Sequence, residues 1–169
     1  MLWLALSLPE FPLQSIAGVD DEQPVVLYET IRGQQLVYAV NQTARLAGID
    51  KGMTLASAQP LATGLQSIER QPEREAQALE QVAQWAQQFT PVVSLQPPAG
   101  LLLEVETSLK VFHGIEALQQ RVADALEPLK YTAQQAVAPT PGGAWLLAQA
   151  GLAEPIMDLP TMQSTLKKL

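Results

Sequence analysis

The sequence predicts an α/β (α+β) fold in which a split β-α-β-β-α-β unit carries a small insertion after its first strand. Two segments, residues 72–89 and 115–129, have apolar residues at three- and four-residue steps and are predicted to form amphipathic helices. Short apolar runs before, between and after these helices predict the strands of a sheet. Of the 169 residues, 47% are hydrophobic and 16% are charged, which favours a folded domain over a disordered chain.

The first strand is predicted at residues 2–8, which are apolar at nearly every position, as in a central strand that is covered on both faces. Pro9 and Pro12 are expected to end this strand, because proline cannot donate a hydrogen bond to a β-ladder.

The insertion is predicted to contain a hairpin followed by two short helices. The turn at Arg32-Gly33 joins the hairpin strands, Asn41 caps the first helix, and Gly48 ends it. The four elements are expected at residues 24–28, 36–40, 42–47 and 54–61.

After the insertion, the two long helices alternate with a second hairpin and a last strand. A further helix and a tail at 152–169 follow. The hairpin strands, the last strand and the further helix are expected at residues 92–95, 101–105, 132–138 and 140–150. Without the insertion this order is the ferredoxin-like one, and we expect an antiparallel-containing sheet with its helices packed on one face.

Charge and composition exclude several classes of protein. The formal net charge of −7 argues against strong DNA binding through phosphate neutralisation, so we expect contact with DNA to be weak or indirect. The chain has no cysteine and only one histidine, His113, which excludes thiolate and multi-histidine metal sites. The N-terminal apolar run is too short to span a membrane, and we expect no signal peptide, no membrane partner and a cytoplasmic location.

Enzymes with this sheet topology, such as palm-type polymerases and cyclases, bind two divalent cations through carboxylates on the first strand and at the turn of the central hairpin. In this sequence the first strand offers Ala5 and Ser7, and the hairpin turn offers Ala99 and Gly100. None of these residues is a strong metal ligand. The sequence therefore predicts no metal, no cofactor and no catalytic residue at the expected positions.

The nearest acidic residues give only a weak alternative. Glu104 and Glu106 are expected on one face of a strand and would form half of a metal site, although a solvated pair on an edge strand is the favoured interpretation. Glu10 follows the first strand without a second carboxylate near it in the sequence and is interpreted as a surface acid.

Several segments together carry a family resemblance. A strand and an N-x-x-A-R helix at residues 32–45 are followed by a G-[IV]-x-x-G-M motif within 47–53. This segment resembles the fingers of Y-family (DinB/UmuC-type) translesion DNA polymerases. Residues 89–93, 103–105 and 137–141 are similar to the segments around the catalytic hairpin and the last palm strand of that family.

The resemblance implies a division of the chain into four segments. Residues 1–15 would hold the first palm strand, 16–71 a fingers-like insertion, 72–151 the rest of the palm, and 152–169 the beginning of a thumb.

The departures from the family pattern concern its catalytic residues. The family has an aspartate where we align Ala5 and an Asp-Glu pair where we align Ala99 and Gly100. A family tyrosine aligns with Gln42, whereas the triphosphate-contacting arginine matches Arg45. The resemblance thus implies a protein without its metal carboxylates, in which Arg45 is a vestigial contact to a nucleotide phosphate.

The N-terminal segment is similar to the ImuB-type branch of the family, which implies a non-enzymatic adaptor in translesion synthesis, DNA repair and induced (SOS) mutagenesis. Its expected partners are a sliding clamp, a RecA-like protein and an error-prone polymerase, bound mainly through regions outside this sequence. One alternative is an active Y-family polymerase with a metal site rebuilt from Glu10, Glu104 and Glu106. The other is an unrelated ferredoxin-like regulatory binding domain, which would have no reason to contain the insertion.

Overall fold

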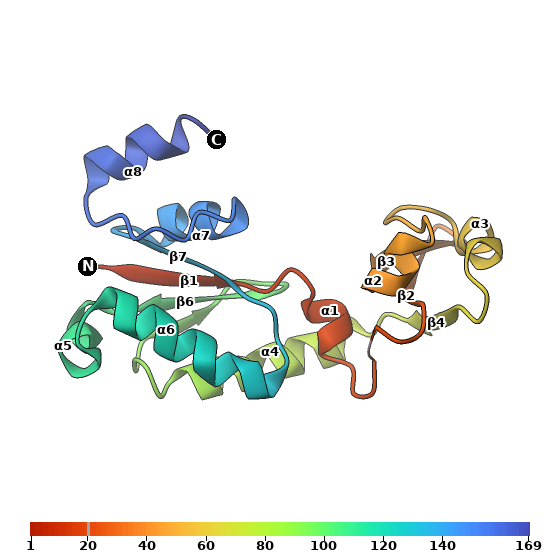
Figure 1. Ribbon diagram of the computed structural model, residues 1–169, viewed down its shortest axis with the longest axis horizontal. Coiled ribbons are helices and arrows are strands. Elements are labelled where there is room, and N and C mark those ends of the chain that lie inside the picture. Colours follow the sequence, from red (N-terminus) through yellow and green to blue (C-terminus); the bar gives the residue numbers. More distant parts are fainter. Residues whose placement is uncertain (20) are drawn as a thin grey trace. The chain divides into compact units, whose positions relative to one another are not determined.

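The computed structural model describes residues 1–19 and 21–169, which form two compact units (Figure 1). Unit 1 consists of Met1–Pro9 together with Ala76–Leu169, and unit 2 consists of Glu10–Glu75. The chain leaves unit 1 after its first strand and returns to it after completing unit 2. The second unit is therefore an insertion between the first strand and the first long helix.

Unit 1 is built on a four-stranded antiparallel sheet with the strand order β5-β6-β1-β7. The hairpin strands lie on one side of β1 and the last strand lies on the other, so the first strand of the chain is central. This is the arrangement predicted for the split β-α-β-β-α-β unit. The strands are β1 (Trp3–Ser7), β5 (Val93–Leu95), β6 (Gly100–Glu104) and β7 (Gln134–Ala138).

The helices of unit 1 cover both faces of this sheet. Figure 1 shows α4 and α6 below the sheet and α7 above it, so the expectation that the helices pack on one face was wrong. The physical reason lies in β1, where both Leu4 and Ala5 are fully buried although their side chains point to opposite faces. The helices are α4 (Pro72–Ala86), α5 (Leu109–Phe112), α6 (Ile115–Leu126), α7 (Pro141–Gln149) and α8 (Leu159–Leu166). The first turn of α4, up to Glu75, belongs to unit 2, and the rest of the helix belongs to unit 1.

The ends of these helices follow from their sequence. The helix at 115–126 changes to a 3₁₀ turn, Glu127–Leu129, where Pro128 has no amide hydrogen to donate. The hydroxyl of Thr140 accepts a hydrogen bond of 3.1 Å from the amide of Gly143 and so caps α7. A 3₁₀ turn, Glu106–Ser108, leads from β6 into α5.

Unit 2 contains a three-stranded sheet with the order β3-β2-β4, and the predicted insertion, 16–71, lies within this unit. The predicted hairpin is confirmed: β2 and β3 are antiparallel, and both turn residues have a positive φ, 51° at Arg32 and 80° at Gly33. The strands are β2 (Val25–Ile31), β3 (Gln34–Val40) and β4 (Gln66–Glu69).

Two elements of unit 2 were not predicted. The strand β4 pairs in parallel with β2, and the short helix α1 follows β1, with Pro12 in its first turn. The predicted short helices are present, although the second one changes to a 3₁₀ turn at Gln59–Leu61. The helices are α1 (Phe11–Gln14), α2 (Gln42–Leu46) and α3 (Leu55–Ala58).

Within the described part of the chain, no helix has both the length and the apolar character that crossing a bilayer would require.

Candidate functional site

The pairing of β1 with β6 determines which residues meet at the predicted catalytic positions. Ser7 pairs with Gly100, whereas Ala5 pairs with Leu102 and so lies two residues further from the hairpin turn. Ala99 directly precedes Gly100 at that turn. A carboxylate at position 5 would therefore not be level with carboxylates at the turn, and the strand residue beside Ala99 and Gly100 is Ser7.

The side chains at this level offer little to a cation. Ser7 is only 8% exposed and contributes one neutral hydroxyl, Ala99 contributes a methyl group, and Gly100 contributes no side chain. Magnesium ions in proteins are bound by charged and neutral oxygen ligands, usually with at least one carboxylate. The residues present here do not fit a two-cation site.

The indole ring of Trp145 fills the space beside Gly100. A Cβ atom at position 100 would collide with the Cζ3 and Cη2 atoms of Trp145 and would lie 3.1 Å from the carbonyl oxygen of Leu6. The aromatic ring therefore takes the volume that any side chain at position 100 would need. Glycine at this position is a packing requirement of α7.

The same sheet face is a closed apolar core. Trp3 and Trp145, both partly buried, pack against a cluster of small and large apolar residues drawn from β1, β6, β7, α7 and the segment that follows α7. Because the strands contribute mainly small side chains here, α7 packs closely on the sheet, and Ala5 is fully buried. The buried members are Ala5, Leu102, Ala136, Ala138, Ala144, Leu147, Ala148, Ile156 and Met162.

The alternative acidic pair lies at the opposite end of β1. Glu104 pairs with Trp3, and Glu106 lies beyond the end of β6 in a 3₁₀ turn, so the expectation that both acids share one face of a strand was wrong. A Glu104 side-chain oxygen accepts a hydrogen bond from the amide of Glu106, and the Glu106 carboxylate pairs with the N-terminal ammonium of Met1 at 2.7 Å. Among the described residues, no group of three or more acidic or histidine side chains is arranged to bind a metal ion.

Arg45, the predicted phosphate contact, is engaged in unit 2. Its guanidinium lies 3.6 Å from the carboxylate of Glu10, and the two side chains are 45% and 39% exposed. A second guanidinium nitrogen donates to the side-chain oxygen of Gln42 at 3.4 Å. The structure thus brings together Glu10 and Arg45, which the sequence placed in separate hypotheses.

The helix that carries Arg45 is fixed by Asn41. The side-chain oxygen of Asn41 accepts hydrogen bonds from the amides of Ala44 (3.0 Å) and Val25 (2.9 Å), and its side-chain nitrogen donates to the carbonyl oxygen of Gln23 at 2.6 Å. The predicted N-cap is confirmed, and the same side chain also ties α2 to the beginning of β2.

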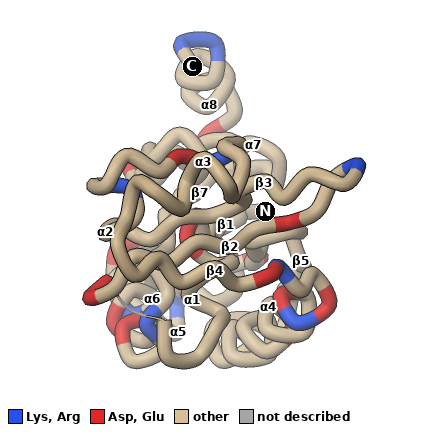
Figure 2. The backbone as a smooth tube through the Cα atoms, turned by 90° about the vertical axis from the view of Figure 1, so that its right-hand side faces the viewer, with Lys and Arg blue, Asp and Glu red and all other residues tan. Residues whose placement is uncertain are grey.

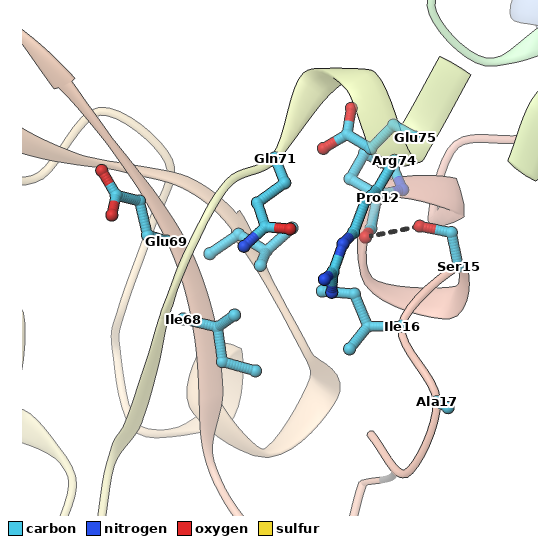
Figure 3. A pocket seen from close by; sticks show the side chains of 10 residues that line it. Pro12, Ser15, Ile16, Ala17, Ile68, Glu69, Gln71, Arg74 and Glu75 are labelled. Atoms are coloured by element: carbon cyan, nitrogen blue, oxygen red, sulfur yellow. Dashed lines mark hydrogen bonds between the residues drawn. The ribbon is translucent and has the colours of Figure 1, made fainter. Parts of the chain in front are cut away.

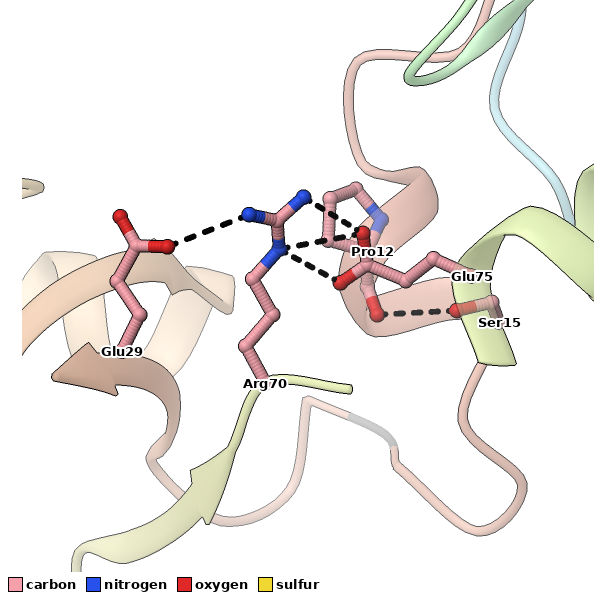
Figure 4. A network of polar contacts seen from close by, with 5 residues as sticks. All are labelled: Pro12, Ser15, Glu29, Arg70 and Glu75. Atoms are coloured by element: carbon pink, nitrogen blue, oxygen red, sulfur yellow. Dashed lines mark hydrogen bonds and ion pairs between the residues drawn. The ribbon is translucent and has the colours of Figure 1, made fainter. Parts of the chain in front are cut away.

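A polar network in unit 2 was not predicted (Figure 4). The guanidinium of Arg70 is 17% exposed and makes hydrogen bonds of 3.0–3.2 Å to both oxygens of Glu75. It also pairs with Glu29 at 3.2 Å and lies 3.9 Å from the centre of the Tyr38 ring. Burial alone would lower the pKa of Arg70, but the hydrogen bonds and charge of Glu75 outweigh it, and the pKa is raised.

Sequence reasoning missed both Trp145 and Arg70. Trp145 packs against Gly100, which is distant in the sequence, and the only signal for this contact was a glycine at the start of a strand, where glycine is unfavourable without a close neighbour. Arg70 has a nearby partner, Glu75, which offered a local signal, but its second partner, Glu29, is distant in the sequence.

Comparison with known protein families and curated proteins agrees with the family resemblance of the sequence. The model of the impB/mucB/samB family matches residues 13–149. Protein ImuB from two strains of Caulobacter vibrioides, NA1000/CB15N and ATCC 19089/CB 15, is 29% identical over 104 residues. The matched region covers 62% of this chain and 23% of each relative, so the chain spans about a quarter of the length of these curated relatives.

Comparison with solved structures supports the predicted fold of this chain. The post-insertion binary complex of Dbh DNA polymerase has a TM-score of 0.78 and 19% identity, and the match covers 98% of this chain and 51% of that one. DinB from Sulfolobus solfataricus has a TM-score of 0.71 and 18% identity, with coverage of 93% and 48%. The predicted fold is therefore confirmed.

Proposed function

The chain belongs to the impB/mucB/samB family, and we propose on this premise that it is a polymerase-like module that acts as a protein-binding adaptor in translesion synthesis, without nucleotidyl transfer of its own. The match to this family and to ImuB confirms the Y-family resemblance of the sequence, including its ImuB-type character. The alternative of an unrelated ferredoxin-like regulatory domain was therefore wrong.

One observation supports the proposal that the module does not catalyse nucleotidyl transfer. At the level where β1 meets the hairpin turn, Ser7 pairs with Gly100 and the ring of Trp145 fills the space beside Gly100. Two divalent cations would activate a primer hydroxyl and neutralise a triphosphate. A hydroxyl, a glycine and an indole cannot hold two such cations, so the module would lack the charge that this reaction needs.

The proposal that the module is an adaptor rests on its family membership and on the net charge of the chain. The chain carries 17 acidic and 10 basic residues, and Figure 2 shows the basic residues dispersed among acidic ones along the backbone. A chain with this net negative charge gives little attraction to a phosphate backbone. In this proposal the module works in the cytoplasm during induced mutagenesis, beside a sliding clamp, a RecA-like protein and an error-prone polymerase. Segments outside this sequence would contribute most of the contacts to these partners.

A primer-extension assay tests the proposal directly. We expect the natural protein that contains this chain to extend no primer with Mg²⁺ or Mn²⁺, because Ser7, Ala99 and Gly100 supply no carboxylate where β1 meets the hairpin turn. We also expect Ser7→Ala to leave damage-induced mutation frequency in cells unchanged, whereas deletion of the gene lowers it. Metal-dependent extension that is lost with Glu10→Gln, Glu104→Gln or Glu106→Gln would instead establish the active-polymerase alternative.

The pairing of Arg45 with Glu10 gives a second prediction. Neutralising Glu10 should release the Arg45 guanidinium, so Glu10→Gln is expected to raise the affinity for inorganic triphosphate by about two- to fivefold, the range of an exposed ion pair. Shifts of the α2 amides in ¹H–¹⁵N spectra measure this affinity. Glu73→Gln removes the same charge from an exposed site in unit 2 and should give a smaller increase. An equal increase in both variants would show that only net charge matters and that Arg45 is not a phosphate contact.

A further inference from the structure

Unit 2 has a hollow of about 170 Å³ at the edge of its sheet (Figure 3). Pro12, Ile16, Leu27 and Ile68 supply its apolar walls. Figure 3 shows Ile16 and Ile68 on opposite sides of the opening. An apolar cavity of about 150 Å³ is large enough for a benzene ring, so the hollow has room for one apolar side chain.

A cation lies at the mouth of this hollow. The exposed side chain of Arg74, from the first turn of α4, extends over the opening (Figure 3). Within the described ranges Arg74 has no ion-pair partner, because the adjacent Glu75 is taken by Arg70. Glu69 also borders the hollow, but its carboxylate points away from the opening in Figure 3. A carboxylate brought to the mouth would therefore meet a guanidinium that forms no ion pair with a described residue.

The hollow adjoins an unpaired strand edge. β4 is the outer strand of the sheet and pairs with β2 only, so its other side has no strand partner within residues 1–19 and 21–169. An unpaired strand edge offers backbone donors and acceptors to an extended peptide. Ile68 and Glu69 belong to this strand and also line the hollow.

From these three features we propose that the hollow binds an extended segment of a partner protein. The segment adds to the free edge of β4, places one apolar side chain between Ile16 and Ile68, and sets on Arg74 a carboxylate two residues along, on the same face of the added strand. The inference rests on the proposed adaptor function and deepens it by naming the chemistry of one partner segment. Backbone pairing supplies the general affinity, and the hollow and Arg74 supply the selectivity.

Short blocked peptides test the inference on the 169-residue chain itself. The probe is acetyl-Leu-Val-Asp-Val-amide, in which Leu and Asp share one face of an extended strand, and its comparators replace Asp by Asn or Leu by Ser. We expect saturable ¹H–¹⁵N shifts at Ile68, Gln71 and Arg74 at peptide concentrations of about 5 mM or below. The Asn peptide should bind about threefold more weakly, as for loss of an exposed ion pair, and the Ser peptide should not saturate.

Matched arginine variants separate the local contact from general charge. Arg74→Gln should abolish the preference for the Asp peptide over the Asn peptide, whereas Arg121→Gln, an exposed site on α6, should preserve it. Equal binding of the two peptides to the unmodified chain, or the absence of saturable shifts beside β4, would overturn the inference. Neither result bears on primer extension or on cellular mutagenesis, so the proposed function is tested separately.

Discussion

Replacing Gly100 by glutamate is expected to lower the free energy of unfolding by about 2–4 kcal/mol, through overpacking and burial of a charge without a partner. Any side chain at this position displaces the ring of Trp145, and the first atom also approaches the carbonyl oxygen of Leu6. The ring can leave only by exposing the apolar surface that it now buries against α7 and the sheet. Chemical unfolding followed by tryptophan fluorescence measures the change, because Trp3, Trp85 and Trp145 all belong to unit 1.

The chain offers a close control for this prediction. Gly142→Glu makes the same substitution at an exposed position in the first turn of α7, where a Cβ atom would have no neighbour within 4 Å. A negative charge near a helix N-terminus is neutral to favourable, so this variant should be as stable as the parent. If Gly100→Glu and Gly142→Glu unfold at the same denaturant concentration, Trp145 does not close the palm, and the main observation behind the proposed function is lost.

The elements that local sequence specifies were predictable. The spacing of Ile115, Leu118 and Val122 fixed α6, and the Arg32-Gly33 turn fixed the hairpin of unit 2. The strand β4 was missed because its four residues are mostly polar and its parallel partner is distant in the sequence.

The helix α1 was missed for a different reason. A proline after an apolar run is expected to end the strand, but proline is also common in the first turn of a helix, where Pro12 lies. The expectation that the helices pack on one face of the sheet was wrong because no local pattern in the sequence identifies the helix that covers the second face. Both faces of β1 are apolar.

In the candidate site, too, some features were predictable from the sequence and others depended on tertiary packing. Residue identity alone shows that Ala99 and Gly100 carry no carboxylate, but only the register of β1 and β6 shows that Ser7, rather than Ala5, is level with them. The positions of Trp145 and of the hollow beside β4 depend on tertiary packing, which leaves no periodic signal in the sequence. The sequence therefore shows that these positions have no carboxylate, but it does not predict that the ring of Trp145 packs there instead.

The second large effect is expected in unit 2, where Glu75→Gln should lower stability by about 2–3 kcal/mol, somewhat less than breaking a fully buried ion pair. Glu75 is 8% exposed and binds the Arg70 guanidinium through both carboxylate oxygens, so the neutral amide leaves a largely buried cation that, among the described residues, pairs only with the carboxylate of Glu29. No tryptophan lies in unit 2, and hydrogen exchange of the β2 and β4 amides is therefore the appropriate measurement.

A neighbouring acid on the same helix makes this prediction specific. Glu73 also lies in the first turn of α4 but is exposed, so Glu73→Gln removes the same charge without touching Arg70. We expect this variant to change stability by less than about 0.5 kcal/mol, as for an exposed residue at a helix terminus. Replacing Arg70 by Met together with Glu75 by Leu should restore part of the lost stability, because an apolar pair leaves no buried charge uncompensated. Equal exchange rates at β2 and β4 in the Glu73→Gln and Glu75→Gln variants would mean that the network does not stabilise the sheet on which the hollow and Arg45 depend.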